Sequence, residues 1–162
     1  MSKIYHKSPI GCLEIKGSKN GISSVKKVDA AGQDSKEVPK VLSDCADQLT
    51  EYFDGKREDF DLALDWSGNT EFNQSVWNEL IQIPYGRTTN YATIAEKIDN
   101  PKAVRAVGLA NRNNPIAIIV PCHRVIAKNG DLQGYFYGLE VKRQLLQLEN
   151  PKSFAEQGSL FE

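Results

Sequence analysis

The chain has 162 residues, enough for one compact domain or two small ones with a hydrophobic core each. A hydrophobic fraction of 40% and a charged fraction of 25% are typical of a globular protein, and the longest apolar run, Ile116 to Val120, is too short to span a membrane. Because no apolar signal segment follows Met1-Ser2-Lys3, we expect a cytoplasmic protein without a membrane partner.

The cysteine and histidine content argues against disulfides and against a metal site. The three cysteines are an odd number without Cys-x-x-Cys spacing, which favours a reducing compartment. With only two histidines, a zinc site is poorly supported, and we expect no metal. Cys12 on a predicted strand and Cys45 on an apolar helical face are expected to be core residues.

The net charge of −1 hides an uneven distribution along the chain. Between Pro84 and Glu149 there are nine Lys and Arg against five Asp and Glu, whereas the remainder has eleven against sixteen. A locally basic half on a near-neutral protein suits short, local contact with phosphates. The split taken alone is equally compatible with chance.

The first third of the chain predicts a small α+β unit. Residues 3–28 predict strands, and Asn20-Gly21 between two of them is a strong hairpin signal. Apolar residues at helical spacing predict a helix over 41–53, which ends near Gly55. Phe60, Leu62 and Leu64 recur at every second residue among Asp59, Asp61 and Asp65, and this spacing predicts one more strand over 60–64. The predicted domain boundary is Trp66-Ser67-Gly68-Asn69.

The second part of the chain is predicted to be mainly helical. Thr70 is placed to cap a helix that reaches Ile81, and Asn90 to cap a second helix. Pro101 occupies the favoured first position of a third helix after the tight turn Asp99-Asn100. Two short helices across such a turn predict a helix-turn-helix, with an ordinary helical corner as the alternative. The third helix is expected to bury Ala103, Val104, Val107 and Ala110.

The outward face of that third helix favours the helix-turn-helix. Lys102, Arg105, Leu109 and Arg112 recur at helical spacing, so they share one face. This face is basic and is flanked by the small residues Ala106, Gly108 and Ala110, which would let the backbone approach a nucleic-acid groove closely.

A sulfur nucleophile is predicted in Pro121-Cys122-His123-Arg124-Val125, directly after the apolar run. The thiolate is the reactive form of cysteine, and a neighbouring His or Arg favours it. Adjacent residues of an extended chain point to opposite sides, so we expect a water to bridge Cys122 and His123. Glu149 lies on the apolar side of the last helix, where His123 is a sensible partner for its carboxylate; an ordinary surface position is the alternative.

The stretch from about Ile83 to Glu149 resembles the O6-alkylguanine-DNA alkyltransferases. Three motifs carry the resemblance: residues 105–108 (Arg-Ala-Val-Gly), Asn114-Pro115, and the pentapeptide 121–125. The resemblance implies an α+β protein with a small antiparallel-sheet, RNase H-like domain over 1–68 and a mainly helical domain with a winged helix-turn-helix over 69–150. It leaves 151–162 as a C-terminal tail.

The resemblance also implies an activity and its participants. Such proteins flip O6-alkylguanine, chiefly O6-methylguanine, out of double-stranded DNA and move the alkyl group irreversibly to a cysteine, once per molecule and without a cofactor. We expect a monomer.

The resemblance assigns parts to individual residues. Cys122 would be the acceptor, His123 its base through a water, and Glu149 the group that orients the histidine. Tyr91 would hydrogen-bond guanine N3, Asn114 would tie the helix-turn-helix to the active-site strand, and Arg105 would fill the space left by the flipped base. The base pocket is expected to contain Val125 through its carbonyl, Tyr135 and Phe136. The expected DNA contacts are Lys102, Arg105, Ala106, Gly108 and Arg112.

One departure from the family pattern affects the pocket. The bulky Phe136 and Tyr137 follow Tyr135 where relatives usually have small residues, so we hypothesise a narrower pocket that favours methyl over benzyl adducts.

Three rival functions use the same residues differently. They are a non-catalytic protein that binds alkylated DNA, a transcription regulator with Cys122 as a switch, and a cysteine hydrolase. The presence of Cys122 disfavours the first, since the acceptor cysteine is replaced in such relatives, and the acidic N-terminal unit offers the second no effector signature. The adjacency of Cys122 and His123 disfavours the third.

Overall fold

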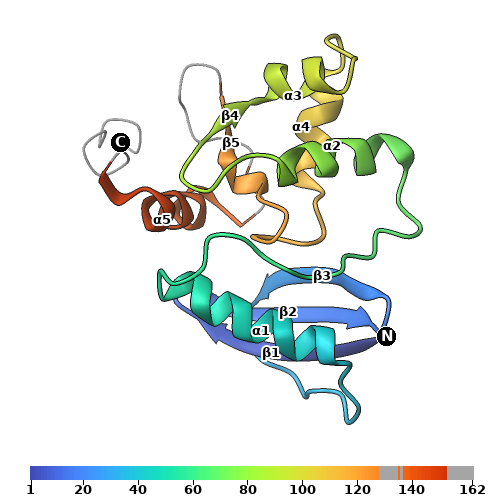
Figure 1. The fold of residues 1–162 in the computed structure, drawn as a ribbon, viewed down its shortest axis with the longest axis vertical. Coiled ribbons are helices and arrows are strands. Elements are labelled where there is room, and N and C mark those ends of the chain that lie inside the picture. The colour runs from blue at the N-terminus through green and yellow to red at the C-terminus, as the bar shows by residue number, and fades with distance from the viewer. Residues whose placement is uncertain (128–134, 136, 153–162) are drawn as a thin grey trace. The chain divides into compact units, whose positions relative to one another are not determined.

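The structure, a computed structural model, describes residues 1–127, 135 and 137–152. It divides into two compact units (Figure 1). Unit 1 contains Met1–Ser67 together with Pro115–Ala117, and unit 2 contains Gly68–Asn114 and the described residues from Ile118 onward. None of the described helices is long and apolar enough to cross a membrane.

Unit 1 is an antiparallel sheet with one helix across it (Figure 1). The strands β1 (Ser2–Ser8), β2 (Gly11–Ser18) and β3 (Gly21–Val28) pair in chain order, which confirms the hairpin predicted at Asn20-Gly21. Gly21 has φ +142°, and a Cβ there would lie 2.7 Å from the carbonyl oxygen of Ala63, so only glycine fits.

The helix α1 (Lys40–Phe53) confirms the predicted helix over 41–53. It buries its apolar face, including Leu42, Leu49 and Tyr52. Cys45 on this face is fully buried, as predicted, whereas Cys12 is only half-buried, so its prediction as a core residue is wrong. The reason is that Cys12 points away from α1, while its neighbour Leu13 points toward the core.

The predicted strand over 60–64 is wrong, because this segment makes only a single bridge, between Leu64 and Ile22 of β3. The edge of β3 is shared with a second segment: the amide of Val25 donates to the Pro115 carbonyl (2.9 Å), and the amide of Ala117 donates back to the Val25 carbonyl (3.0 Å). Because the two segments share one edge of β3, each pairs with too few residues to form a regular ladder of hydrogen bonds.

Unit 2 begins with two helices whose predicted caps are confirmed. In α2 (Glu71–Ile81) the Thr70 hydroxyl accepts a hydrogen bond from the Asn73 amide at 3.1 Å. In α3 (Tyr91–Lys97) the Asn90 side chain accepts one from the Thr93 amide at 2.9 Å. These bonds satisfy amides that a helix start leaves without partners.

The helix α4 (Val104–Arg112) starts later than predicted, with Ala103 as its first flanking residue. Pro101 and Lys102 lie in the preceding turn, which the Ala103 amide closes by donating to the Asn100 carbonyl at 3.0 Å. At this helix start Ala103 is half-buried and Val104 is 38% exposed, so their predicted burial is wrong, whereas Val107 and Ala110 are buried as expected.

Unit 2 also contains two short strands and a C-terminal helix. The short strands β4 (Thr89–Asn90) and β5 (Val125–Ile126) pair in parallel and hold the start of α3 beside the end of the cysteine motif. The last described helix is α5 (Leu139–Glu149), which packs against the cysteine motif through its buried residues Lys142, Leu145, Leu146 and Glu149.

Candidate active site

Cys122, His123 and Arg124 form a single 3₁₀ turn, η1 (Cys122–Arg124), which the amide of Arg124 closes by donating to the Pro121 carbonyl at 3.0 Å. The prediction that Cys122 and His123 lie on an extended chain is therefore wrong. Just upstream, Ile118 has φ +72°, a conformation that a β-branched residue adopts only when its surroundings enforce it. The backbone is thus strained at Ile118, shortly before the motif, and turns at Cys122.

Two asparagines at the end of α4 hold this turn. The Asn114 side-chain amide donates to the Val120 carbonyl at 2.9 Å, before the turn, and the Asn111 amide donates to the Cys122 carbonyl at 3.3 Å. The first contact agrees with the expected tie between the helix-turn-helix and the cysteine motif. Asn111 is 1% exposed and was missed by sequence analysis, although it stands next to Ala110 on the buried side of the helix.

The Cys122 sulfur lies in a buried site with hydrogen-bond donors directed at it; the residue is 6% exposed. Burial raises the pKa of its thiol. The Asn114 side chain, the positive charge of Lys142 and the backbone amides of Cys122 and His123 act in the opposite direction but do not outweigh burial, so the pKa of the thiol stays above its ordinary value. These groups stabilise a thiolate at Cys122 in a place that solvent does not reach.

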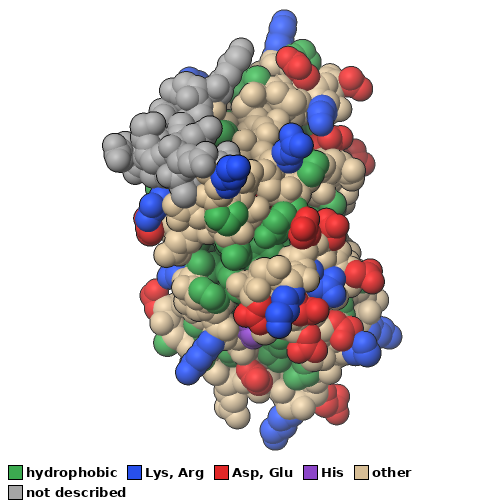
Figure 2. Space-filling view, turned by 60° about the vertical axis from the view of Figure 1, so that its left-hand side comes forward, with side chains coloured by type: hydrophobic (Ala, Val, Ile, Leu, Met, Phe, Trp, Pro, Cys, Tyr) green, Lys and Arg blue, Asp and Glu red, His purple; other side chains and the backbone are tan. Residues whose placement is uncertain are grey.

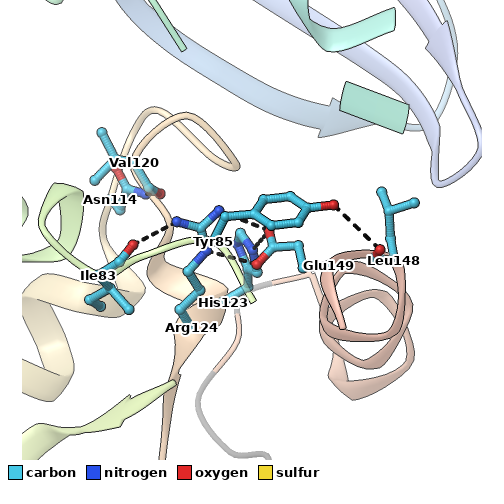
Figure 3. A network of polar contacts seen from close by, with 8 residues as sticks. All are labelled: Ile83, Tyr85, Asn114, Val120, His123, Arg124, Leu148 and Glu149. Atoms are coloured by element: carbon cyan, nitrogen blue, oxygen red, sulfur yellow. Dashed lines mark hydrogen bonds and ion pairs between the residues drawn. The ribbon is translucent and has the colours of Figure 1, made fainter. Parts of the chain in front are cut away.

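His123, Arg124 and Glu149 form a buried polar network (Figure 3). The His123 Nε2 lies 2.6 Å from Glu149 Oε2. Arg124 donates from Nε to Oε1 (2.8 Å) and from Nη2 to Oε2 (3.1 Å) of the same carboxylate, and from Nη1 to the Ile83 carbonyl (2.7 Å). Glu149 therefore contacts His123, as predicted, and its alternative surface position is wrong.

The network fixes the protonation of the histidine. Burial would raise the pKa of Glu149, but His123 and Arg124 outweigh it and hold that pKa far below its ordinary value. Burial lowers the pKa of His123, as do the charges of Arg124 and Lys142, against the raising effect of Glu149. A neutral imidazole must then donate from Nε2 to the carboxylate, which leaves Nδ1 as an acceptor. Among the described residues Nδ1 has no hydrogen-bond partner.

Lys142 is a buried cation in this site that sequence analysis missed. Its Nζ donates to the Val125 carbonyl at 2.6 Å. Burial lowers its pKa to about 8, while the negative charge of the Cys122 thiolate raises it. A signal was present, since Lys142 precedes Leu145, Leu146 and Glu149 by three, four and seven residues and so shares their face of α5.

The negative charge of the Cys122 thiolate acts on two of the predicted tyrosines. Burial raises the pKa of Tyr91, at the start of α3, and the negative charge of Cys122 raises it further. Tyr135 is 8% exposed, and burial followed by the same charge raises its pKa well above the ordinary value. Its ring meets that of Tyr137 edge to face, with centroids 5.8 Å apart. Phe136, the other predicted pocket residue, lies outside the described residues.

The predicted DNA-contact residues lie on or before α4. Arg105, Ala106 and Arg112 are exposed on the helix, and Lys102 is exposed in the turn before it rather than on the helix face. Gly108 is half-buried, and a Cβ there would lie 3.9 Å from the Tyr91 ring. The end of α4 is therefore connected to the cysteine turn through the hydrogen bonds of Asn111 and Asn114.

The geometry combines a buried sulfur, a neutral imidazole with an open acceptor nitrogen, and a carboxylate that orients the imidazole. Among residues 1–127, 135 and 137–152, no group of three His, Cys, Asp or Glu side chains is placed to hold a metal ion. The arrangement can deprotonate a thiol and present it to an electrophilic carbon.

Comparison with protein families matches both parts of the chain. Residues 1–66 match the ribonuclease-like domain of 6-O-methylguanine DNA methyltransferase, and residues 71–151 match the DNA-binding domain of the same family.

Similar proteins extend over nearly the whole chain. A methylated-DNA–protein-cysteine methyltransferase of Methanosarcina acetivorans is 49% identical over 149 residues, 88% of this chain and 94% of its own length. One of Mycobacterium tuberculosis is 45% identical over 92% of each chain.

Solved structures agree. The O6-methylguanine methyltransferase of M. tuberculosis superposes with a TM-score of 0.81 at 44% identity over 100% of both chains. The M. tuberculosis OGT protein in complex with DNA gives a TM-score of 0.81 at 45% identity over 98% of both chains.

Proposed function

Because the chain belongs to the 6-O-methylguanine DNA methyltransferase family, we propose that it repairs double-stranded DNA by moving the alkyl group from guanine O6 to Cys122. The transfer is irreversible and happens once per molecule. The observation that carries the proposal is the buried Cys122 in a turn whose next residue, His123, is oriented by Glu149 at 2.6 Å. The protein is proposed to act as a cytoplasmic monomer on DNA that carries O6-alkylguanine, chiefly O6-methylguanine.

The first step forms the thiolate. A water accepts the thiol proton of Cys122 and passes a proton to Nδ1 of His123, the acceptor without a partner among the described residues. Glu149 keeps the imidazole in the required tautomer and stabilises the imidazolium that forms. The 3₁₀ turn supports this step as well as an extended chain would, because a water spans the gap between neighbouring side chains.

The second step transfers the carbon. The thiolate attacks the alkyl carbon, a sulfur–carbon bond forms, the carbon–O6 bond breaks, and its electron pair passes to the purine. Tyr91 hydrogen-bonds guanine N3 and supplies a proton to the leaving base. Solvent then returns a proton to the tyrosine, and the imidazolium of His123 releases its proton to solvent. The net reaction converts a thiol and an O6-alkylguanine into a thioether and guanine.

The base and the duplex are held by separate groups. Tyr135, Phe136 and the carbonyl of Val125 contact the flipped base; that carbonyl already accepts from Lys142, and its second lone pair stays available. Asn114 couples α4 to the cysteine turn, and Arg105 fills the gap that the flipped base leaves. The remaining proposed DNA contacts are Lys102, Ala106, Gly108 and Arg112.

The test is peptide mass spectrometry after incubation with a duplex that contains O6-methylguanine. The proposal expects a methyl group on the peptide with Cys122 and guanine restored in the DNA. Cys122→Ala should abolish transfer and leave duplex binding nearly intact. Binding without modification would instead support a non-catalytic sensor or a regulatory switch, and repeated turnover would support a hydrolase.

The narrow-pocket hypothesis has its own test. Phe136 and Tyr137 are expected to slow benzyl transfer relative to methyl transfer, measured as single-turnover rates with O6-benzylguanine and O6-methylguanine in the same duplex. Replacement of both residues by glycine should raise the benzyl rate more than the methyl rate. Comparable rates for the two adducts in the unchanged protein contradict the hypothesis.

A further inference from the structure

One face of the sheet in unit 1 points away from α1. The helix lies on the opposite face, because a Cβ on Gly17 would meet the Leu42 side chain at 3.1 Å and the Thr50 hydroxyl lies 3.3 Å from the His6 ring. Side chains alternate along a strand, and directly paired residues of antiparallel strands point to the same side. The register therefore assigns each residue of β1, β2 and β3 to one face.

On the face away from α1, nine side chains form three cross-strand rows. The rows are Lys3–Lys16–Ser24, Tyr5–Glu14–Lys26 and Lys7–Cys12–Val28.

This basic sheet face, defined by Lys3, Lys7, Lys16 and Lys26, carries four positive charges against one negative charge. The lysines are exposed except Lys16, which is half-buried. The negative charge belongs to Glu14, which is 7% exposed. The Tyr5 hydroxyl donates to its Oε2 at 2.8 Å, and Lys16 and Lys26 lie 3.5 Å and 3.7 Å from its Oε1. Glu14 is thus a buried carboxylate that Tyr5 binds directly and that two of the lysines flank.

The excess of positive charge on the basic sheet face does not follow from the overall charge of unit 1. Residues 1–67 contain ten Lys and Arg and twelve Asp and Glu, so the unit as a whole is acidic while this face is basic. Acidic residues collect on α1 instead, as Asp44, Asp47 and Glu51. On the face drawn in Figure 2, basic and acidic side chains are intermingled. The nearby loop carboxylate of Asp34 is bound to the Tyr5 amide at 2.9 Å, at the edge of β1.

We propose that the basic sheet face is a second DNA-contact surface, which binds the phosphate backbone of duplex DNA outside the alkyl-transfer site. Neighbouring positions on the face are about 4.8 Å apart across strands and roughly 6.8 Å apart along a strand. A DNA strand with one phosphate per about 3.4 Å of its axis can offer an anion to each lysine. The contact is independent of sequence, because lysine pairs with phosphates as a point charge. The inference rests on the proposed function, which places the protein on DNA.

The test is the salt dependence of binding to an undamaged duplex. The basic-face variant changes Lys3, Lys7, Lys16 and Lys26 to Gln; a matched control changes Lys19, Lys36, Lys40 and Lys56, exposed lysines of the same unit, to Gln. Both lose the same net charge. We expect the slope of log Kd against log salt to fall by about two to four in the basic-face variant. The control should retain the wild-type slope.

A second variant guards against misfolding. Lys16 and Lys26 contact Glu14, so the double variant K3Q/K7Q, which leaves that cluster intact, should lose about half of the slope change. Equal slopes for wild type, control and both basic-face variants overturn the proposal. The proposal is also overturned if the basic-face variant binds phosphatidylserine vesicles more weakly than the wild type while its DNA slope is unchanged. That result would favour a membrane surface as the partner. Methyl transfer to Cys122, measured on the same samples, reports separately on the proposed function.

Discussion

Glu149 is a buried carboxylate that binds both His123 and Arg124. A substitution that removes its charge but keeps its size tests the part it plays in stability and in transfer. Replacement by glutamine keeps the shape but leaves Arg124 as an uncompensated buried cation. It also replaces one of the two acceptor oxygens by an NH2 donor, so the contacts of His123 and Arg124 cannot all be kept. We expect E149Q to lose about 3 kcal/mol or more of unfolding free energy. The single-turnover transfer rate should fall roughly 100-fold.

Urea unfolding and rapid-quench kinetics measure the two effects. E140Q is the matched control, because Glu140 lies at the exposed start of the same helix and pairs with Arg143. An E149Q variant with the stability and rate of E140Q would remove Glu149 from the proposed mechanism.

Lys142 gives the protein a pH-dependent stability of predictable sign. Burial lowers its pKa from the ordinary value of 10.5 to about 8. Between these values the unfolded chain holds a proton that the folded chain has lost, so unfolding takes up a proton and becomes less favourable as the pH rises. Relative to K142M, the wild-type unfolding free energy should therefore increase from pH 8 to 10.5, by on the order of 1–3 kcal/mol. Denaturant titrations of both proteins across this range measure it, and parallel curves would contradict it.

At the scale of elements, the cap of α2 is separable from the chemistry. The Thr70 hydroxyl satisfies the Asn73 amide, so T70A should lose about 1 kcal/mol of unfolding free energy. T70S keeps the hydroxyl and should lose little. Thermal unfolding measures both, and equal losses would show that the methyl group rather than the cap matters. Transfer rates should be unchanged in either variant.

One substitution in α4, G108A, should stabilise the helix and weaken DNA binding at the same time. A Cβ at Gly108 meets nothing closer than the Tyr91 ring at 3.9 Å, so G108A fits without a clash. The replacement should raise the unfolding free energy by about 0.5–1 kcal/mol through helix propensity. If DNA approaches this face closely, the same methyl group should weaken duplex binding several-fold. Unchanged affinity, measured by fluorescence anisotropy, would place Gly108 outside the interface.

At the scale of the whole molecule, local patterns predicted what depends on neighbours in sequence. The hairpin at Asn20-Gly21 and the caps Thr70 and Asn90 were predictable, because a few adjacent residues determine each. The contact of His123 with Glu149 was predictable because a carboxylate on an apolar helix face needs a partner.

Features that depend on distant segments could not be predicted. The bridge of residues 115–117 to β3 and the parallel pair of β4 and β5 join segments far apart in sequence. The 3₁₀ turn at Cys122 follows from asparagines that reach it from α4, so the apolar run before it gave a misleading indication of extended chain. Lys142 carried a helical-face signal, but a lysine in such a position is ordinarily exposed.

The most direct measurement of the central claim is the stoichiometry of transfer. Protein is titrated with an excess of duplex DNA that contains O6-methylguanine, and intact-mass spectrometry counts the methyl groups gained. Cys45 is fully buried, with its thiol pKa raised to about 12 by burial, and serves as an internal control for unspecific alkylation. The account predicts a plateau at one methyl group per protein, located on Cys122. Guanine formed in excess of protein, or a methyl group on another residue, would contradict it.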